Sequence, residues 1–199
     1  MVLVTEPPRL QLVQWVAEVR EKAVGLPWEQ YETEAEFGAF SVRLNEAETG
    51  WLLERNTTEA VLLAAFCVAL SEWTGRNTQW VKVGRLPMLI DMQGEENPAA
   101  ILKRVGEQVQ RVRDNEELRE LAGMEEVLAK YAVPTPEVKL HVGDGALTEP
   151  HRYPLELRAE WIEGQLFIRL HFAKSALSEV TAGWLAERFQ AALQELIRA

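Results

Sequence analysis

The longest apolar stretch of the chain covers residues 60–70 and contains no charged or strongly polar side chain. Thr57 or Thr58 can cap this stretch as a helix, and Gly75 can end it in the left-handed conformation. A helix that is apolar on every side belongs in the centre of a layered domain. The pattern therefore predicts a buried central helix, followed by a strand over residues 79–83.

Five further helices are predicted from capping residues and from apolar residues at helical spacing. They begin after Pro8, at Asn45 with Glu48 as the reciprocal acid, at Pro98, near Leu118 and after Ser178. In the last helix, which extends to Arg198, we expect Val180 and Trp184 to face inward. Amphipathic helices of this kind cover the face of a sheet in a layered domain.

Alternating apolar and polar residues predict strands over residues 37–44, near 137–142, and over 155–162 and 165–172. Glu163-Gly164 joins the last two strands as a hairpin. His171 lies between two apolar residues of its strand, so we expect it to face solvent or the rim of the sheet. Together these elements predict an α/β (α+β) fold, a two-layer sandwich with a mixed, largely antiparallel sheet and helices packed on it.

A loop rich in acidic and aromatic residues, LPWEQYETEAE, separates the first predicted helix from the rest of the chain. We therefore expect two regions: an N-terminal helix and linker over residues 1–36, and a subdomain over residues 37–199. The length of 199 residues allows one domain or two small ones.

The charge of the chain argues against nucleic acid and membrane surfaces as partners. Lys and Arg total 21 against 31 Asp and Glu, which gives a formal net charge of −10 that repels phosphate backbones and anionic lipid. The start of the chain lacks the pattern of a signal peptide, and residues 60–70 are too few to span a bilayer. Cys67, the single cysteine, is expected to be a small buried hydrophobe. These features predict a cytoplasmic protein.

Few residues of the chain carry recognisable chemistry. His141, His151 and His171 form no metal-binding motif, so we expect no metal site. The sequence G-D-G at 143–145 is more typical of a turn than of a phosphate-binding loop. His141 and Asp144, at the end of a predicted strand, are the candidate ligand-binding residues. We predict no catalytic residue.

Six segments, in order along nearly the whole chain, resemble the second half of condensation and epimerisation domains of nonribosomal peptide synthetases. The most informative is TTEAVLLAAFCVALSEWTGR, which is similar to a family helix that ends in W-T-G-R. The others are LVQWVAEV, FSVRLNEAETGWLLER, NPAAILKRVGEQVQRV, PEVKLHVG, and YPLELRAEWIEGQLFIRLHF with the following LAERFQAALQELI. The resemblance implies a chloramphenicol-acetyltransferase-like half domain.

The same resemblance implies that catalytic residues are missing. The family's catalytic histidine belongs to an H-H-x-x-x-D-G motif in the first half, and this chain has no His-His pair. Lys82 stands where epimerisation domains place an acid, if Gly84-Arg85 is aligned with their G-R. His141-Val142 stands in place of the family's N-Y. General acid–base catalysis needs a positioned proton donor or acceptor, and the sequence offers none at these positions.

Four hypotheses follow. The leading one is a C-terminal condensation/epimerisation-like subdomain of nonribosomal peptide biosynthesis that is not an enzyme alone and acts as a homodimer or with a partner chain. The second is a subunit of a split condensation or acyltransfer enzyme whose partner carries H-H-x-x-x-D-G. The third is a module that binds a small molecule, or the phosphopantetheine arm of a carrier protein, near His141. The fourth is an α/β domain unrelated to this family.

Overall fold

The computed structural model describes residues 8–28, 36–55, 58–95, 97–115, 129–130, 132–144 and 150–199. Thr57 and most of the helix predicted near Leu118 lie outside these residues. Among the described residues, no helix is both long and apolar enough to cross a membrane.

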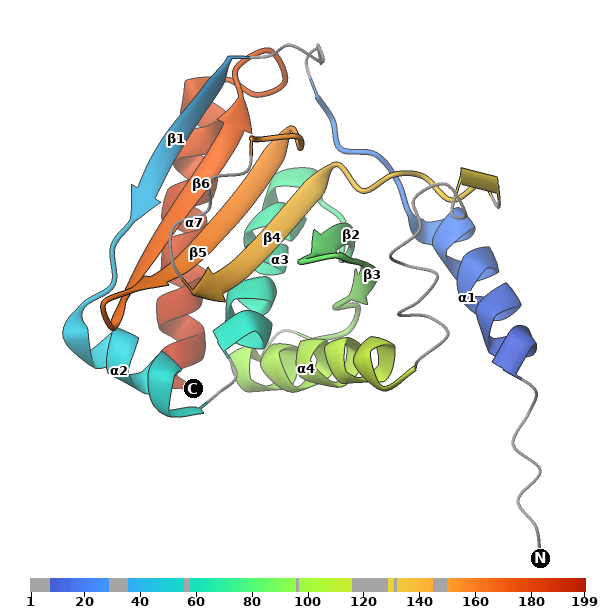
Figure 1. Cartoon of the computed structure of the whole chain (residues 1–199), viewed down its shortest axis with the longest axis horizontal. Helices are drawn as coiled ribbons and strands as arrows, with labels where there is room; N and C mark the ends of the chain where they lie inside the picture. The colour runs from blue at the N-terminus through green and yellow to red at the C-terminus, as the bar shows by residue number, and fades with distance from the viewer. Residues whose placement is uncertain are drawn as a thin grey trace, which may run out of the picture.

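The described strands form one six-stranded sheet in the order β1-β6-β5-β4-β2-β3 (Figure 1). The strands are β1 (Phe37–Val42), β2 (Thr78–Val83), β3 (Leu86–Asp91), β4 (Val138–Asp144), β5 (Leu155–Ile162) and β6 (Gln165–Ala173). β4 runs parallel to both β2 and β5, and the other three pairings are antiparallel. The predicted mixed, largely antiparallel sheet and the hairpin at Glu163-Gly164 are confirmed.

The strand β3 is an addition to the sequence prediction. Pro87 lies in its second position, and a proline weakens the strand signal because it has no N–H for the ladder. β3 is an edge strand that pairs only with β2 among the described strands, which is the position where a sheet tolerates proline.

Three helices pack on one face of the sheet: α3 (Thr58–Thr74), α4 (Pro98–Asp114) and α7 (Glu179–Arg198) (Figure 1). A fourth helix, α2 (Glu46–Arg55), packs against α3 and α7. Asn45 and Glu48 each accept a hydrogen bond from the backbone N–H of the other, as predicted for the start of α2. The side-chain oxygens of Asn97 and Ser178 cap α4 and α7 by accepting hydrogen bonds from the backbone N–H groups of Ala99 and Thr181. Gly75 follows α3 with a φ of +69°.

The main core lies between this helical layer and the sheet. Residues 61–67 of α3 are all buried, which confirms the central helix. α7 packs beside α3, where the rings of Phe66 and Phe189 meet edge to face at 6.2 Å between centroids. From the sheet, β5 contributes Leu155, Leu157 and Ala159, and β6 contributes Ile168, Leu170 and Phe172. These are the alternate residues that the sequence predicted to face inward.

The helix α1 (Pro8–Lys22) packs on the other face of the sheet, over β2 and β3. Val16, Val19 and Trp80 belong to one buried cluster there, and the ring centroids of Trp15 and Trp80 are 6.1 Å apart. The remainder of this sheet face, over β4, β5 and β6, is not covered by a described helix. We call it the open face.

Two residues of α7 differ from the prediction. Val180 is 84% exposed and Trp184 is 42% exposed, so neither faces inward. The buried side of α7 is set by Ala182, Leu185 and Phe189. At 100° per residue, Val180 and Trp184 fall on the opposite side of the helix.

Candidate functional site

The open face carries a row of buried charges on β5. Glu156 is 1% exposed, Arg158 5% and Glu160 4%, although they alternate with the apolar residues of the core. β5 lies between β4 and β6, so side chains of both neighbouring strands flank this row. Strand alternation correctly predicts that these residues point away from the helices, but it does not predict their burial.

Glu156 is the centre of the cluster. Its Oε2 accepts a hydrogen bond of 2.9 Å from Arg158 Nη2 and lies 3.0 Å from His151 Nδ1. Its Oε1 lies 3.4 Å from Lys139 Nζ. Burial would raise the pKa of Glu156, but the hydrogen bonds from Arg158 and His151 and the nearby cations outweigh it and lower the pKa. The carboxylate is therefore charged at neutral pH.

His151 and His171 lie against each other beside Glu156. The centroids of the two imidazole rings are 4.1 Å apart. The ring of Phe37 also lies near His151, with 5.1 Å between the centroids. His171 is directly opposite Glu156 in the β5–β6 register. Burial, followed by the charges of His151 and Arg158, lowers the pKa of His171 to about 4. His171 does face away from the helices, but it is half-buried against another ring instead of being free in solvent.

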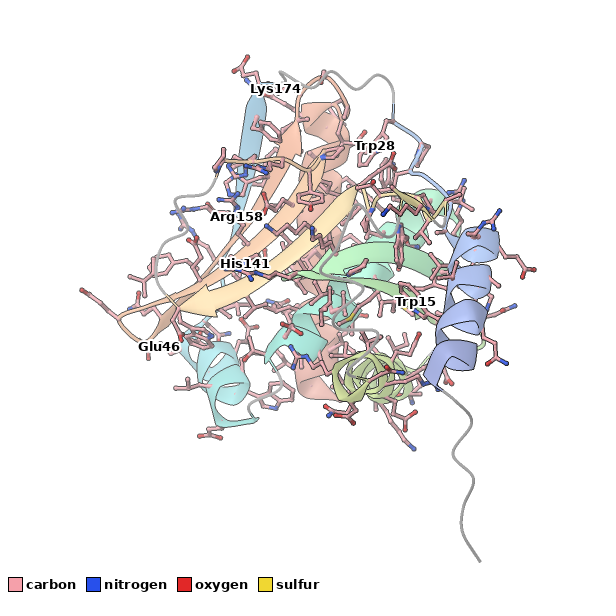
Figure 2. All side chains as sticks on the ribbon, turned by 45° about the vertical axis from the view of Figure 1, so that its right-hand side comes forward. Trp15, Trp28, Glu46, His141, Arg158 and Lys174 are labelled. Atoms are coloured by element: carbon pink, nitrogen blue, oxygen red, sulfur yellow. The ribbon has the colours of Figure 1, made fainter. Side chains whose placement is uncertain are left out.

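His141 lies on the open face next to this cluster, opposite Arg158 in the parallel register (Figure 2). Its ring folds over Gly143, where an added Cβ would lie 2.7 Å from His141 Nε2. Burial, with the nearby charge of Lys139, lowers the pKa of His141, so the ring is neutral at neutral pH. A neutral imidazole at this place can donate and accept a hydrogen bond.

Asp144 is not brought to the same place. It lies three residues after His141 on β4, so strand alternation directs the two side chains to opposite faces. Asp144 is exposed at the end of the strand. Of the two candidate ligand-binding residues, only His141 is next to the buried charges.

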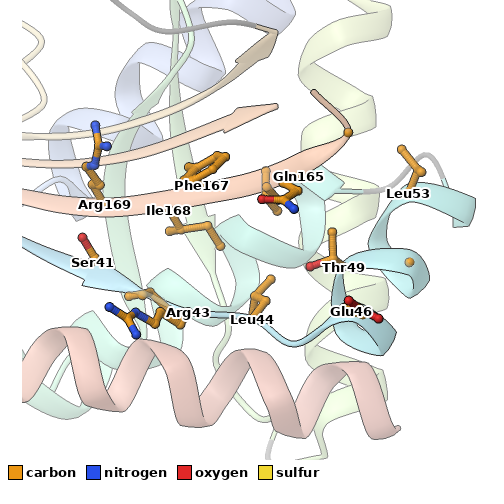
Figure 3. A pocket seen from close by; sticks show the side chains of 14 residues that line it. Ser41, Arg43, Leu44, Glu46, Thr49, Leu53, Gln165, Phe167, Ile168 and Arg169 are labelled. Carbon is orange, nitrogen blue, oxygen red and sulfur yellow. The ribbon is translucent and has the colours of Figure 1, made fainter. Parts of the chain in front are cut away.

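A cavity lies elsewhere, between α2, the end of β1 and the β5–β6 hairpin (Figure 3). It has a volume of about 690 Å³. Its walls include Arg43, Glu46, Leu53, Phe167 and Arg169, which come from both polar and apolar positions. No histidine or cysteine is among the described residues that line it. This hollow can accept a side chain or a small molecule, but it does not assemble a catalytic set.

No thiol or hydroxyl is among the described hydrogen-bond and ion-pair partners of Glu156. Cys67 is fully buried in α3, and burial raises the pKa of its thiol, so it stays protonated. Within the described parts of the chain, no three His, Cys, Asp or Glu side chains are grouped so that they could hold a metal ion. Glu156 and Arg158 are buried and paired with each other, so His141 is the member of this group that is exposed enough to contact a polar ligand.

No protein-family model matches the chain, and no curated protein matches it. Solved structures do match. The cyclization-docking bidomain of the EpoB nonribosomal peptide synthetase from Sorangium cellulosum aligns with a TM-score of 0.72 and 15% identity, over 98% of this chain and 49% of that one. The epimerization domain from the third module of tyrocidine synthetase B aligns with a TM-score of 0.67 and 16% identity, over 94% and 56%.

The X-domain from teicoplanin biosynthesis gives a similar result, with a TM-score of 0.67 and 15% identity over 94% of this chain and 55% of that one. The chain thus spans about half the length of these three solved structures. The resemblance to a condensation/epimerisation half domain is confirmed at the level of the fold: this chain has the fold of half of a condensation-type domain.

Proposed function

We propose that the chain is a C-terminal, condensation/epimerisation-like subdomain that acts in nonribosomal peptide biosynthesis and is not catalytic alone. The observation that carries the proposal is the match of nearly the whole chain to about half of several condensation-type domains. A half domain of this kind needs a second half, either a partner chain that carries H-H-x-x-x-D-G or a second copy of this chain. Carrier proteins with a phosphopantetheine arm would present the substrates.

The described contacts support a partner-dependent role. The described ion pairs of Glu156 are with Arg158, Lys139 and His151, and none of these partners is a hydroxyl or a thiol. Several large apolar side chains remain exposed on α2, β6 and α7: Leu53, Phe167, Val180 and Trp184. Exposed apolar groups are a common feature of surfaces that bind another protein.

The test is reconstitution with a chain that carries H-H-x-x-x-D-G and is encoded beside this one. The two chains would be co-expressed, purified through a tag on one of them, and assayed for amide formation between two loaded carrier proteins. We expect activity only when both chains are present, and none when the second His of the partner's motif is changed to Ala. Failure of the chains to co-purify, with no activity from the mixture, would refute partner-dependent catalysis.

A second candidate function is a module that binds a carrier arm or another small molecule at His141. It is favoured by the position of His141, a half-buried neutral imidazole beside Arg158 on the open face. We expect His141→Ala to weaken binding of a phosphopantetheine-loaded carrier protein, measured by titration calorimetry. Asp144→Asn is the matched control, because its side chain lies on the opposite side of β4. An unchanged affinity in His141→Ala would exclude this role for His141.

A further inference from the structure

A second cavity, of about 650 Å³, is lined by basic residues although the chain is acidic. It lies where the turn between β2 and β3, the start of β4 and the segment before β5 meet. Its four cationic side chains are Lys82, Arg85, Lys139 and Arg152, and Glu137 is the one acid among its described lining residues. A local positive charge in a chain of net charge −10 marks a place that attracts anions.

Two of the cations are held in place by one aromatic ring. Lys82 Nζ lies 5.6 Å and Lys139 Nζ 5.5 Å from the centroid of the Tyr153 ring. The side chain of Lys139 is only 13% exposed. Cation–π contact stabilises each ammonium group, but the fold brings two like charges to the same ring. Glu156, whose Oε1 lies 3.4 Å from Lys139 Nζ, offsets part of this charge.

Two described acids near the cavity also have other contacts. Glu137 Oε2 accepts a hydrogen bond of 2.8 Å from the backbone N–H of Leu26. Glu156, which contacts Lys139, also binds Arg158 and His151. Arg85 and Arg152 are exposed and form no ion pair with the described residues. Both guanidinium groups are therefore available to a ligand.

The walls of the cavity favour recognition by charged side chains. Pro136, Pro150 and Pro154 line it, and proline has a fixed φ and no backbone N–H. A rigid wall lowers the entropy lost on binding, and the cationic side chains of the lining supply hydrogen-bond donors. Guanidinium forks bind phosphate in a bidentate way, and ammonium groups add point charges.

We propose that this cavity binds the phosphate group of a small organic phosphate. The phosphate could belong to a free metabolite or to the arm of a carrier protein, and the chemistry of recognition is the same. The site is separate from the proposed role of His141, and phosphate binding needs neither a partner half nor condensation activity. Loss of one proposal therefore leaves the other standing.

The experiment compares phosphopantetheine with pantetheine, which lacks the phosphate, by titration calorimetry at low salt. We expect phosphopantetheine to bind the full chain, pantetheine to bind about tenfold more weakly or not at all, and added salt to weaken the binding. A second titration uses a phosphopantetheine-loaded carrier protein as the ligand. Tighter binding of the loaded carrier than of free phosphopantetheine assigns the site to a carrier arm, and equal or weaker binding of the loaded carrier assigns it to free organic phosphates.

The variant Arg85→Gln/Arg152→Gln tests the location. Both side chains are exposed, so the variant should fold, which circular dichroism checks. We expect its affinity for phosphopantetheine to fall at least about tenfold. The control Arg111→Gln/Arg198→Gln removes the same charge outside the cavity and should bind as the unmodified chain does. Equal weakening in both variants, or equal binding of pantetheine and phosphopantetheine, would overturn the proposal.

Discussion

Glu156 illustrates how much of this structure depends on single charged residues. A carboxylate that is 1% exposed is stable only because Arg158, His151 and Lys139 surround it. Arg158 is itself buried, and its Nε has no hydrogen-bond partner. Removing either member of such a pair leaves the other as an uncompensated buried charge, which costs about 3–5 kcal/mol in proteins generally.

His171 makes the stability of the protein depend on pH. Its pKa of about 4 in the folded chain is below the ordinary value of 6.5, so the unfolded chain takes up a proton more readily. The stabilisation is complete above pH 6.5 and is lost as the pH falls toward 4. Because the half-buried ring is partly screened by solvent, we expect a loss of about 1 kcal/mol between about pH 7 and pH 5.

Urea unfolding of the unmodified chain and of His171→Gln at these two pH values measures this contribution. Glu156 and His141 also have lowered pKa values and lose stabilisation in acid, but they are present in both proteins. The difference between the two proteins therefore isolates His171. Parallel losses of unfolding free energy in both proteins would contradict the assignment.

At the scale of elements, the pairing of β1 with β6 depends on a glycine. Gly38 lies opposite Phe172, and a Cβ at Gly38 would come within 2.6 Å of Phe172 Cε1. Phe172 cannot move away easily, because it is 1% exposed and stacks on Phe40 at 5.7 Å between centroids. We expect Gly38→Ala to lower the free energy of unfolding by about 1–3 kcal/mol, measured by urea denaturation.

Gly106→Ala is the matched control for this prediction. Gly106 lies inside α4, and an added Cβ there meets no atom within 4 Å. Alanine is the better helix former, so we expect this variant to gain up to about 1 kcal/mol. If Gly38→Ala were as stable as the unmodified chain, the close approach of β1 to Phe172 would be wrong.

The elements also show what the sequence can and cannot predict. The fully apolar run of α3 and the alternation in β5 and β6 predict burial directly, because each pattern is stable only when its apolar side chains are packed in a core. The burial of Glu156 was not predictable, since it depends on His151 and His171 from other segments. Val180 and Trp184 lie on the outer side of α7, so the prediction that they face inward, which was based on their apolar character alone, was wrong.

The candidate sites were less predictable than the fold. His141 was chosen because it ends a predicted strand, but its neighbour Arg158 comes from β5 and is apparent only in the sheet register. The basic cavity gathers Lys82, Arg85, Lys139 and Arg152 from three separate segments. No continuous run of basic residues signals such a site, because the parallel pairing of β4 with its neighbours creates it.

At the scale of the whole molecule, the exposed side of α7 is a candidate contact for a second copy. Val180 and Trp184 are one helical turn apart and both exposed. If the chain acts as half of a condensation-type domain, as proposed above, a second copy could take the place of the other half. Apolar burial would favour this pairing.

We expect sedimentation velocity to show concentration-dependent association of the unmodified chain. Val180→Ser/Trp184→Gln removes the apolar contact and should shift the protein toward monomer without loss of stability, since both residues are already exposed. Val24→Ser, which changes a valine that is 55% exposed elsewhere, should leave association unchanged. A chain that stays monomeric at tens of micromolar and binds no hydrophobic dye would argue against self-association, because an apolar contact surface strong enough to pair two copies would then be missing.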